Sequence, residues 1–418
     1  MLSGAPALAA APSPAAIPAA TGQTIADFYA ARNGAPLWTR SGNEIAGAAL
    51  LRQILTAKVD GLDPRRYRVR ELQRALRATN APDAQRRAEQ TITAAFVAFA
   101  SDLRRAPAIG IVYVEDDLRP VPPSPRFLLE AAAGAPSLPA FIDRMGWMHR
   151  FYAPLRTAAL ASGWTRDEQR RVTVNLERVR SLPSGTSRYV MVNAADQRLD
   201  MVEGGIVRDS MRVVVGKPTQ PTPMMAARIR FASLNPYWNV PPDLVAERIA
   251  PSVVKDGVGY LRAKGYRVLS DWSDRPRVIS PATVDWRPVA AGKVELRVRQ
   301  LPGPQNSMGA MKFMFPNAQG IYLHDTPNGE LLKEAARFFS GGCVRLEDAP
   351  RLGRWLFGRA LRPKGARPEQ AVPLTPAVPV YLTYLTAVPD ETGQILWFDD
   401  IYARDSARLA QLDQARRR

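Results

Sequence analysis

The spacing of apolar residues changes once along this chain, near residue 184. From residue 24 to about residue 183, apolar residues recur every three or four positions, which is typical of amphipathic helices. Thr24 is a candidate cap for the first helix, and longer helices are predicted over 83–105 and 165–182. The apolar side chains expected on the buried helix faces are Ile25, Phe28, Tyr29, Ile45, Ala49, Ile54, Leu55, Ile92, Phe96 and Phe99.

From residue 187 onward the pattern predicts short strands, because β-branched residues cluster in segments that polar or glycine turns separate. The expected strands are 188–193, 197–203, 210–216, 228–236, 294–301, 309–315, 320–325, 378–388 and 394–400. Residues 241–292 form an insert of mixed character that contains Trp272 and Trp286. From the pattern alone, this insert is either a flap over the sheet or a long connection.

These patterns predict an α+β chain in which a helical N-terminal domain precedes a β-rich domain. The expected division is an Ala/Pro-rich start over 1–23, a helical domain over 24–183, a β-rich domain over 184–402 and a tail over 403–418. The start lacks packing residues and is expected to be disordered. Its small residues suit a signal-peptide cleavage site, although it has no basic n-region, so it is also a candidate remnant of a secretory signal.

The chain carries a net charge of +18, and most of its basic residues are Arg. This charge indicates either an anionic partner or a genome rich in Arg codons. The basic residues are scattered among Asp and Glu with no block of five, which argues against a nucleic-acid-binding arm. No run of eighteen apolar residues is present, so no transmembrane helix is predicted.

The only cysteine, Cys343, follows two glycines in the segment SGGCVR, and a single cysteine excludes an intramolecular disulfide. His324 ends the predicted strand over 320–325, nineteen residues earlier. A thiol attacks as a thiolate, and an imidazole can take its proton, so the two residues are a candidate nucleophile and base. Arg345 and a helix expected to begin just after Cys343 would stabilise the thiolate.

Gly341 and Gly342 allow a tight turn and close backbone approach to a substrate. Backbone N–H groups at Gly342 and Cys343 are candidate donors to a developing oxyanion, which favours acyl transfer. The competing interpretation is structural, because a lone cysteine is often a small buried apolar residue. His149, in the helical half, is expected to be structural. One cysteine and two distant histidines do not form a spaced ligand set, so no metal site is predicted.

Two segments, IYLHDTP at 321–327 and RFFSGGCVRLEDA at 337–349, closely resemble the catalytic signature of the L,D-transpeptidases, the YkuD-like family. The segments that extend this resemblance are 188–205, 213–223, 234–242 and 301–317 in the β-rich half and 28–38, 60–67 and 174–183 around the helical half. The last five resemble the large, scaffold-bearing YcbB-like subgroup. The resemblance implies a helical scaffold followed by a YkuD-like catalytic domain, with 241–292 as an inserted capping segment.

The resemblance also implies roles for individual residues. Cys343 would be the nucleophile and His324 the general base, oriented by the backbone carbonyl of Asp325. Arg345 would anchor the site or meet a substrate carboxylate, and Tyr322 would line the pocket. The turn would be shaped by Ser340, Gly341 and Gly342, and the capping segment would offer Trp272 or Trp286 to the substrate.

The implied activity is that of an exported, periplasmic murein L,D-transpeptidase that needs no cofactor. It would act on peptidoglycan tetrapeptide stems and join the third residues, diaminopimelate, of two stems through a cysteine acyl-enzyme that carbapenems would also form. Alternatives are hydrolysis of cross-links, attachment of proteins to murein, exchange of D-amino acids, and an inactive murein-binding scaffold. Many relatives carry a peptidoglycan-binding module where this chain has only 161–171. Protein partners are not indicated.

Overall fold

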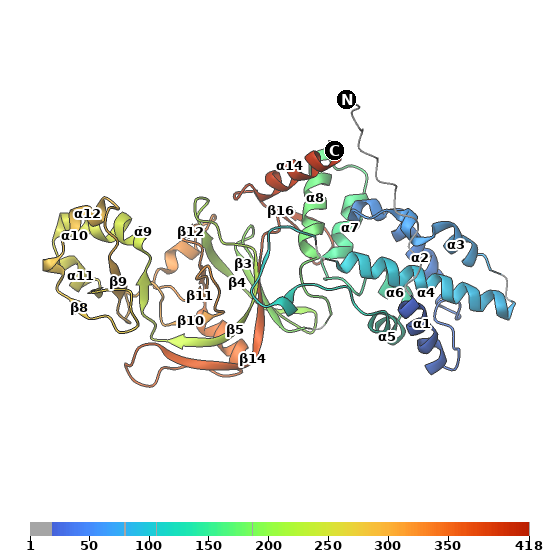
Figure 1. Ribbon diagram of the computed structural model, residues 1–418, viewed down its shortest axis with the longest axis horizontal. Helices are drawn as coiled ribbons and strands as arrows, with labels where there is room; N and C mark the ends of the chain where they lie inside the picture. The colour runs from blue at the N-terminus through green and yellow to red at the C-terminus, as the bar shows by residue number, and fades with distance from the viewer. Residues whose placement is uncertain (1–18, 79–80, 106, 186, 418) are drawn as a thin grey trace, which may run out of the picture. The chain divides into compact units, whose positions relative to one another are not determined.

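The computed structural model describes residues 19–78, 81–105, 107–185 and 187–417 (Figure 1). The chain divides into two compact units. The helical unit comprises residues up to 109, 119–187 and 385–418, and the sheet unit comprises 110–118 and 188–384. The predicted fold class, a helical scaffold followed by a β-rich domain, is confirmed. The predicted disorder over 1–23 lies mostly outside the described residues, but 19–23 belong to a helix.

The helical unit contains one long helix, α4, whose apolar stripe lies at its core. Its helices are α1 (Ala19–Ala31), α2 (Glu44–Leu55), α3 (Val69–Ala75), α4 (Pro82–Arg104), α5 (Pro125–Gly134), α6 (Leu138–Asp143), α7 (Tyr152–Leu160), α8 (Arg166–Val179) and α14 (Arg404–Arg417). As predicted, Ile92, Phe96 and Phe99 are buried. Successive buried positions three or four residues apart fix which face of α4 packs inward.

Three details of the helical prediction are wrong. Thr24 is not a cap, because α1 already begins at Ala19 and the Thr24 hydroxyl donates to the Ala20 carbonyl inside the helix. Ile45 and Leu55 of α2 are 66% and 48% exposed. Ala49 and Ile54 are buried as predicted, and Ala46 and Leu50, three or four residues away from them, complete the buried face of α2.

The C-terminal segment from residue 385 groups with the helical unit, whereas the sequence predicted that the β-rich domain runs to 402. Asp405 explains this grouping, because its buried carboxylate accepts hydrogen bonds from Arg178 of α8 and from Thr386. Asn175 of α8 also donates to the Thr386 hydroxyl. A buried carboxylate needs such partners, so these contacts bind the hairpin β15 (Ala387–Pro389) and β16 (Ile395–Trp397) and the following helix to α8.

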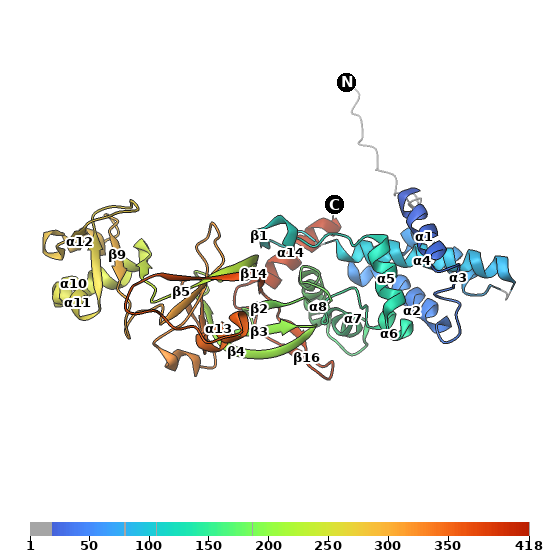
Figure 2. The same cartoon turned by 90° about the horizontal axis from the view of Figure 1, so that it is seen from below.

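The sheet unit is built on a sheet whose strand path closes on itself. The order is β1-β5-β10-β11-β13-β4-β3-β2-β14, and β14 also pairs with β5. The strands are β1 (Val112–Tyr113), β2 (Tyr189–Asn193), β3 (Arg198–Glu203), β4 (Ile206–Gly216), β5 (Met225–Leu234), β10 (Met311–Met314), β11 (Leu323–His324), β13 (Val344–Leu346) and β14 (Gln370–Thr383), with β12 (Phe338–Ser340) paired to β4. Figure 2 shows β2, β3 and β4 side by side. Closure removes free strand edges and encloses an apolar interior.

The insert has a sheet and an apolar core of its own. Its strands, in the order β6-β9-β7-β8, are β6 (Trp238–Val240), β9 (Arg297–Gln300), β7 (Tyr266–Leu269) and β8 (Val278–Ile279). Its helices are α9 (Pro242–Leu244), a π-helical turn (Val245–Ile249), α10 (Ala250–Asp256), α11 (Gly259–Ala263) and α12 (Trp286–Ala290). The core includes Val245, Ile249, Leu261, Val268 and Val298. The expected strand at 294–301 therefore forms β9 of this smaller sheet.

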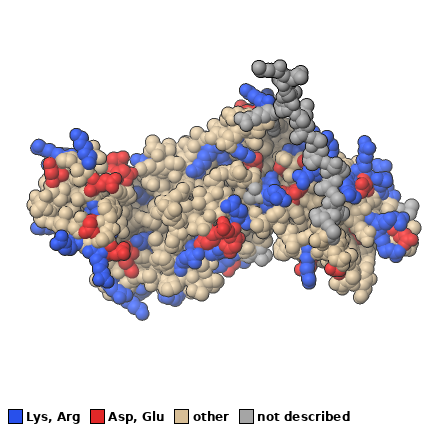
Figure 3. Space-filling model, in the orientation of Figure 1, with Lys and Arg blue, Asp and Glu red and all other residues tan. Residues whose placement is uncertain are grey.

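On the face shown in Figure 3, basic side chains are spread over both units and interleaved with acidic ones. Within the described ranges, no helix is long and apolar enough to cross a membrane.

Candidate active site

Two neighbouring parallel strands bring the predicted nucleophile and base together. In β11 and β13, Leu323 lies opposite Val344, and His324 lies opposite Arg345. Leu323 and Val344 are fully buried, and side chains alternate between the two faces of a strand. The four residues that share the other face are Tyr322, His324, Cys343 and Arg345. Motifs nineteen residues apart in the sequence thus lie on or next to neighbouring strands.

His324 is held as a neutral imidazole with one free lone pair. The side chain is 2% exposed, and Nδ1 lies 2.6 Å from the backbone oxygen of Asp325. Since a carbonyl only accepts, Nδ1 carries the hydrogen and Nε2 can accept a proton. Burial, followed by the charge of Arg345, lowers the His324 pKa to about 3, which the hydrogen bond to Asp325 opposes. The Asp325 carboxylate is occupied elsewhere, because it accepts the Ala310 N–H at 2.8 Å.

The Cys343 thiol is partly exposed and points to the same region as Tyr322. The thiol donates to the Gly320 carbonyl at 3.7 Å, and the hydroxyl and backbone N–H of Tyr322 lie near enough to lower the pKa of the thiol. The Tyr322 and His324 rings lie edge to face with centroids 5.7 Å apart. Burial raises the pKa of the thiol, while the Tyr322 donors and the charge of Arg345 lower it by less. The sequence predicted only that Tyr322 lines the pocket; the structure adds that its hydroxyl and backbone N–H favour the thiolate of Cys343.

The expected helix start beside Cys343 is wrong. The chain after Cys343 continues as β13, which pairs with β11 and β4, and helix α13 (Ala349–Phe357) begins only at Ala349, capped by the Asp348 carboxylate. A helix dipole acts within about one turn, so it is too distant to stabilise the thiolate. The charge of Arg345 and the Tyr322 donors take that place.

The glycine turn is braced by two hydroxyl groups. Ser340 Oγ donates to the Cys343 carbonyl at 2.5 Å and accepts the Gly342 N–H at 3.1 Å. Thr222 Oγ1 donates to the Gly342 carbonyl at 2.8 Å. Gly342 has φ +111°, which a side chain rarely adopts. The Gly342 N–H therefore donates within the turn, to Ser340, and not into the site as the sequence predicted for an oxyanion donor.

Thr222 is the residue that sequence reasoning missed at the turn. It is fully buried, and its hydroxyl also accepts the Gly216 N–H at 2.9 Å, which links the end of β4 to the turn. The sequence did contain a clue to Thr222, because this residue lies in the segment 213–223 that resembles the family. Its role depends on a contact 120 residues along the chain, which spacing alone does not show.

A cavity of about 170 Å³ lies beside the turn, between it and the insert. Gly341 and Arg345 line it from the turn and β13, and Trp238 and Arg248 line it from the insert. Neither predicted tryptophan is among the lining residues. Trp286 is 6% exposed in the insert core and donates to the Pro281 carbonyl, whereas Trp272 is 57% exposed and lies against Arg297. Trp238 is the indole that meets this cavity.

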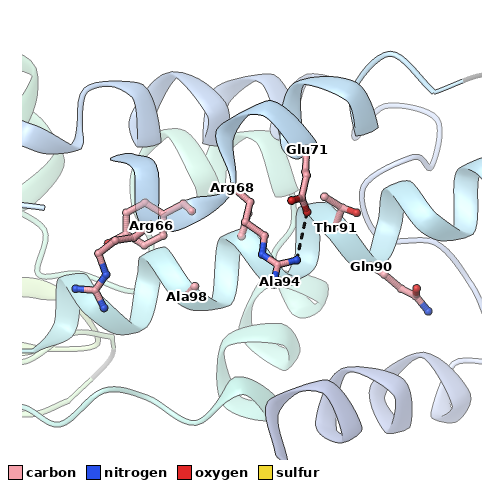
Figure 4. A pocket seen from close by; sticks show the side chains of 9 residues that line it. Arg66, Arg68, Glu71, Gln90, Thr91, Ala94 and Ala98 are labelled. Carbon is pink, nitrogen blue, oxygen red and sulfur yellow. Dashed lines mark hydrogen bonds and ion pairs between the residues drawn. The ribbon is translucent and has the colours of Figure 1, made fainter. Parts of the chain in front are cut away.

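A second cavity, of about 160 Å³, lies in the helical unit between η2 (Pro64–Tyr67), α3 and α4 (Figure 4). Arg66, Tyr67, Arg68 and Glu71 line it together with alanines of α4. Arg68 pairs with Glu71 at 3.2 Å, as the dashed line in Figure 4 marks. His149 belongs to this unit, where it is buried and accepts the Phe151 N–H at 3.3 Å.

In comparisons with known proteins, two family models match separate parts of the chain. Residues 187–363 match the family model of the L,D-transpeptidase catalytic domain, YkuD, and residues 23–158 match the model described as Scaffold domain. A protein of Haemophilus influenzae that carries the name "Putative L,D-transpeptidase" is 31% identical over 251 residues, which are 58% of this chain and 50% of that protein. The chain thus spans about half the length of this curated relative.

A solved structure described as "Structure of the Ldtfm-avibactam carbamoyl enzyme" is 16% identical over 47% of this chain and 48% of its own, with a TM-score of 0.22, a likeness too slight for any conclusion. The two family models together cover the helical scaffold and the sheet that carries Cys343 and His324. The chain therefore carries a domain that matches the L,D-transpeptidase catalytic domain, YkuD, preceded by one that matches the Scaffold domain.

Proposed function

We propose that this protein is a murein L,D-transpeptidase that cross-links the third residues of two peptidoglycan stems through an acyl-enzyme on Cys343. The observation that carries the proposal is the placement of a neutral, buried imidazole on the same sheet face as the thiol, on adjacent strands. A protonated imidazole could not take the thiol proton, and a thiol without a base reacts slowly at neutral pH. Since murein lies outside the inner membrane, we place the protein in the periplasm.

In the first half-reaction, Nε2 of His324 takes the thiol proton as the sulfur attacks the diaminopimelate carbonyl of a tetrapeptide stem. A C–S bond forms, the C–N bond to the terminal D-Ala breaks, and the imidazolium returns its proton to the departing amine. Tyr322 donates to the sulfur and Arg345 is a nearby positive charge, so both stabilise the thiolate as it develops.

In the second half-reaction, the side-chain amine of another stem attacks the thioester. His324 takes a proton from this amine, a C–N bond forms, the C–S bond breaks, and the thiol is restored. The same acyl-enzyme would yield hydrolysis if water attacked and D-amino-acid exchange if a free D-amino acid attacked. It would yield protein attachment if the attacking amine came from a protein. The acceptor therefore decides among these reactions.

Purified protein incubated with tetrapeptide muropeptides tests the proposal. We expect a dimeric product whose mass equals two stems minus one D-Ala, with the new bond between the two third residues. A tripeptide stem, which has no D-Ala to expel, serves as the control and should give no dimer alone. If hydrolysed or exchanged stems were the sole products, the protein would be assigned to those reactions. If no stem were converted and Cys343 were not acylated, the protein would be a binding scaffold.

A further inference from the structure

The cavity between the glycine turn and the insert has more positive charge than its surroundings neutralise. We propose that Arg248 of the insert, together with Arg345 and Lys217, binds a carboxylate of the stem peptide there, so that the insert contributes directly to substrate recognition. The inference rests on the proposed function, since it names the group of the stem that this site would hold. It also gives the insert a defined role beyond covering the sheet.

The charges at this cavity lack matching acids. Arg248 and Arg345 both line it, and neither forms an ion pair within the part of the chain that the structure describes. Burial and then the charge of Arg248 lower the Arg345 pKa, which means that the two guanidinium groups are close enough to repel. Lys217 has only Glu247, at 4.0 Å and largely exposed, and exposed pairs contribute little. An anion bound here would relieve that repulsion.

Two buried polar atoms at the same cavity are left without partners. Arg345 Nε, a donor, and Gln220 Oε1, an acceptor, form no hydrogen bond to any described residue. Such atoms are rare in folded proteins, because leaving them unpaired is unfavourable. The orientation of Gln220 is fixed by its Nε2, which donates to Asp243 at 2.8 Å. Its Oε1 therefore faces the turn, 3.2 Å from where a Cβ on Gly341 would lie.

A donor set beside one acceptor defines the ligand chemistry. The arginines and Lys217 offer donors and positive charge to a carboxylate, and Gln220 Oε1 would accept an N–H close to it. An amino-acid residue carries both groups on one carbon, whereas a phosphate has no N–H to give. The π-helical turn Val245–Ile249 carries Arg248 into the lining, and such turns are frequent at functional sites.

Two of the carboxylates of a tetrapeptide stem fit this description and lie at or next to the bond that breaks. One belongs to the terminal D-Ala, whose peptide N–H adjoins the bond that breaks. The other lies on the side chain of diaminopimelate, next to its amine. Both lie within a few bonds of the carbonyl that Cys343 would attack, so the cavity beside the turn can receive either one. Stems in which one carboxylate at a time is converted to a carboxamide distinguish them.

The experiment compares acylation rates of Cys343, followed by intact mass, for the stem and for a small neutral thioester donor. The quantity of interest is the ratio of the two rates. In Arg248→Gln we expect this ratio to fall about 10- to 100-fold, the size expected when a charge-assisted hydrogen bond is lost. Arg248→Lys, which keeps the charge, should recover part of the loss. Arg262→Gln, an exposed arginine of α11 outside the cavity lining, is the matched control and should keep the ratio.

With the wild type, a stem whose recognised carboxylate is replaced by a carboxamide should lower this ratio as much as Arg248→Gln does. With that carboxamide stem, the wild type and Arg248→Gln should show the same ratio. An unchanged ratio in Arg248→Gln, with Cys343 still acylated by the stem, would overturn the inference and leave the proposed function standing. A wild type that the neutral thioester acylates, but that no stem acylates, would contradict the proposed function itself.

Discussion

Two cavities of this protein, one in the helical unit and one beside the glycine turn, are similar in size and opposite in their electrostatics. The cavity of the helical unit, about 160 Å³, has arginines with acidic partners, since Arg68 pairs with Glu71 and Arg66 pairs with Asp102 at 3.5 Å. The cavity beside the glycine turn, about 170 Å³, is lined by Arg345, which has no acid partner among the described residues and an unpaired buried Nε. Volume therefore does not distinguish the proposed binding cavity from a gap between helices.

What separates them is polar groups that the protein itself leaves unsatisfied. In the helical unit, the Tyr67 hydroxyl also donates to Asp102 at 3.0 Å. These polar groups at the helical cavity therefore already have partners within the protein. Each unpaired buried group at the other cavity costs about 1–3 kcal/mol of folding free energy. At a binding site, a bound molecule can supply the missing partners. The following predictions test this contrast.

Replacement of the nucleophile should have the largest effect. We expect Cys343→Ser to lower the cross-linking rate by several orders of magnitude, about 10⁴-fold or more, because a hydroxyl ionises far less readily than a thiol beside the same imidazole. The near-isosteric change should leave circular dichroism and the melting temperature unaltered. Cross-linking at the wild-type rate by the folded variant would remove Cys343 from the chemistry.

Removal of the base should have the next largest effect and should change the pH profile. His324→Ala should slow acylation by about 10²- to 10⁴-fold at neutral pH. Burial raises the thiol pKa, so without a base the reactive thiolate forms only as the pH rises through that raised value. The variant rate should therefore climb steeply at alkaline pH, whereas the wild type reacts near neutrality. Superimposable pH profiles would make His324 a structural residue.

Loss of the tyrosine hydroxyl should have a smaller effect. Tyr322→Phe removes one donor to the Cys343 sulfur and leaves the backbone N–H of residue 322 in place. Because the lost bond favours the thiolate, the thiol pKa should rise further, and acylation at pH 7 should slow by about 10-fold. The pH dependence of alkylation by a small neutral reagent measures that pKa. An unchanged thiol pKa would restrict Tyr322 to lining the site.

A change at the helical cavity should have the smallest effect of all. Arg68→Gln removes an exposed pair with Glu71, and such pairs contribute about 0–1 kcal/mol to stability. We expect the acylation rate to stay within about twofold and the melting temperature to fall by only a few degrees. A large loss of activity in Arg68→Gln would mean that this cavity also binds substrate, and the contrast between the two cavities would not hold.

The sequence was most informative where function depends on short motifs. The carbonyl of Asp325 beside the imidazole and the buried stripe of α4 were predictable, because each depends on local pattern or on a motif of a few residues. The roles of Cys343 and His324 as nucleophile and base stay predictions. The expected helix start failed because strand pairing with β4 and β11 extends the chain after Cys343. Periodicity alone could not show that pairing.

The insert was the least predictable region for the same reason. Trp286 resembled a substrate contact but fills the core that the insert builds for itself. No sequence pattern marked Arg248 as a cavity residue, because its position at the cavity depends on how the insert folds next to the turn. The unpaired oxygen of Gln220 is visible only once every neighbour has been placed. Contacts between segments far apart in the chain decide all three.

The most direct test of the account is the mass and position of the adduct that a tetrapeptide stem leaves on the protein. Intact mass after rapid quenching should rise by the mass of the stem minus D-Ala, and peptide mapping should place this adduct on Cys343, with one D-Ala released per adduct. An adduct at any other residue, or D-Ala release without a thioester on Cys343, would contradict the acyl-enzyme on which the whole account depends.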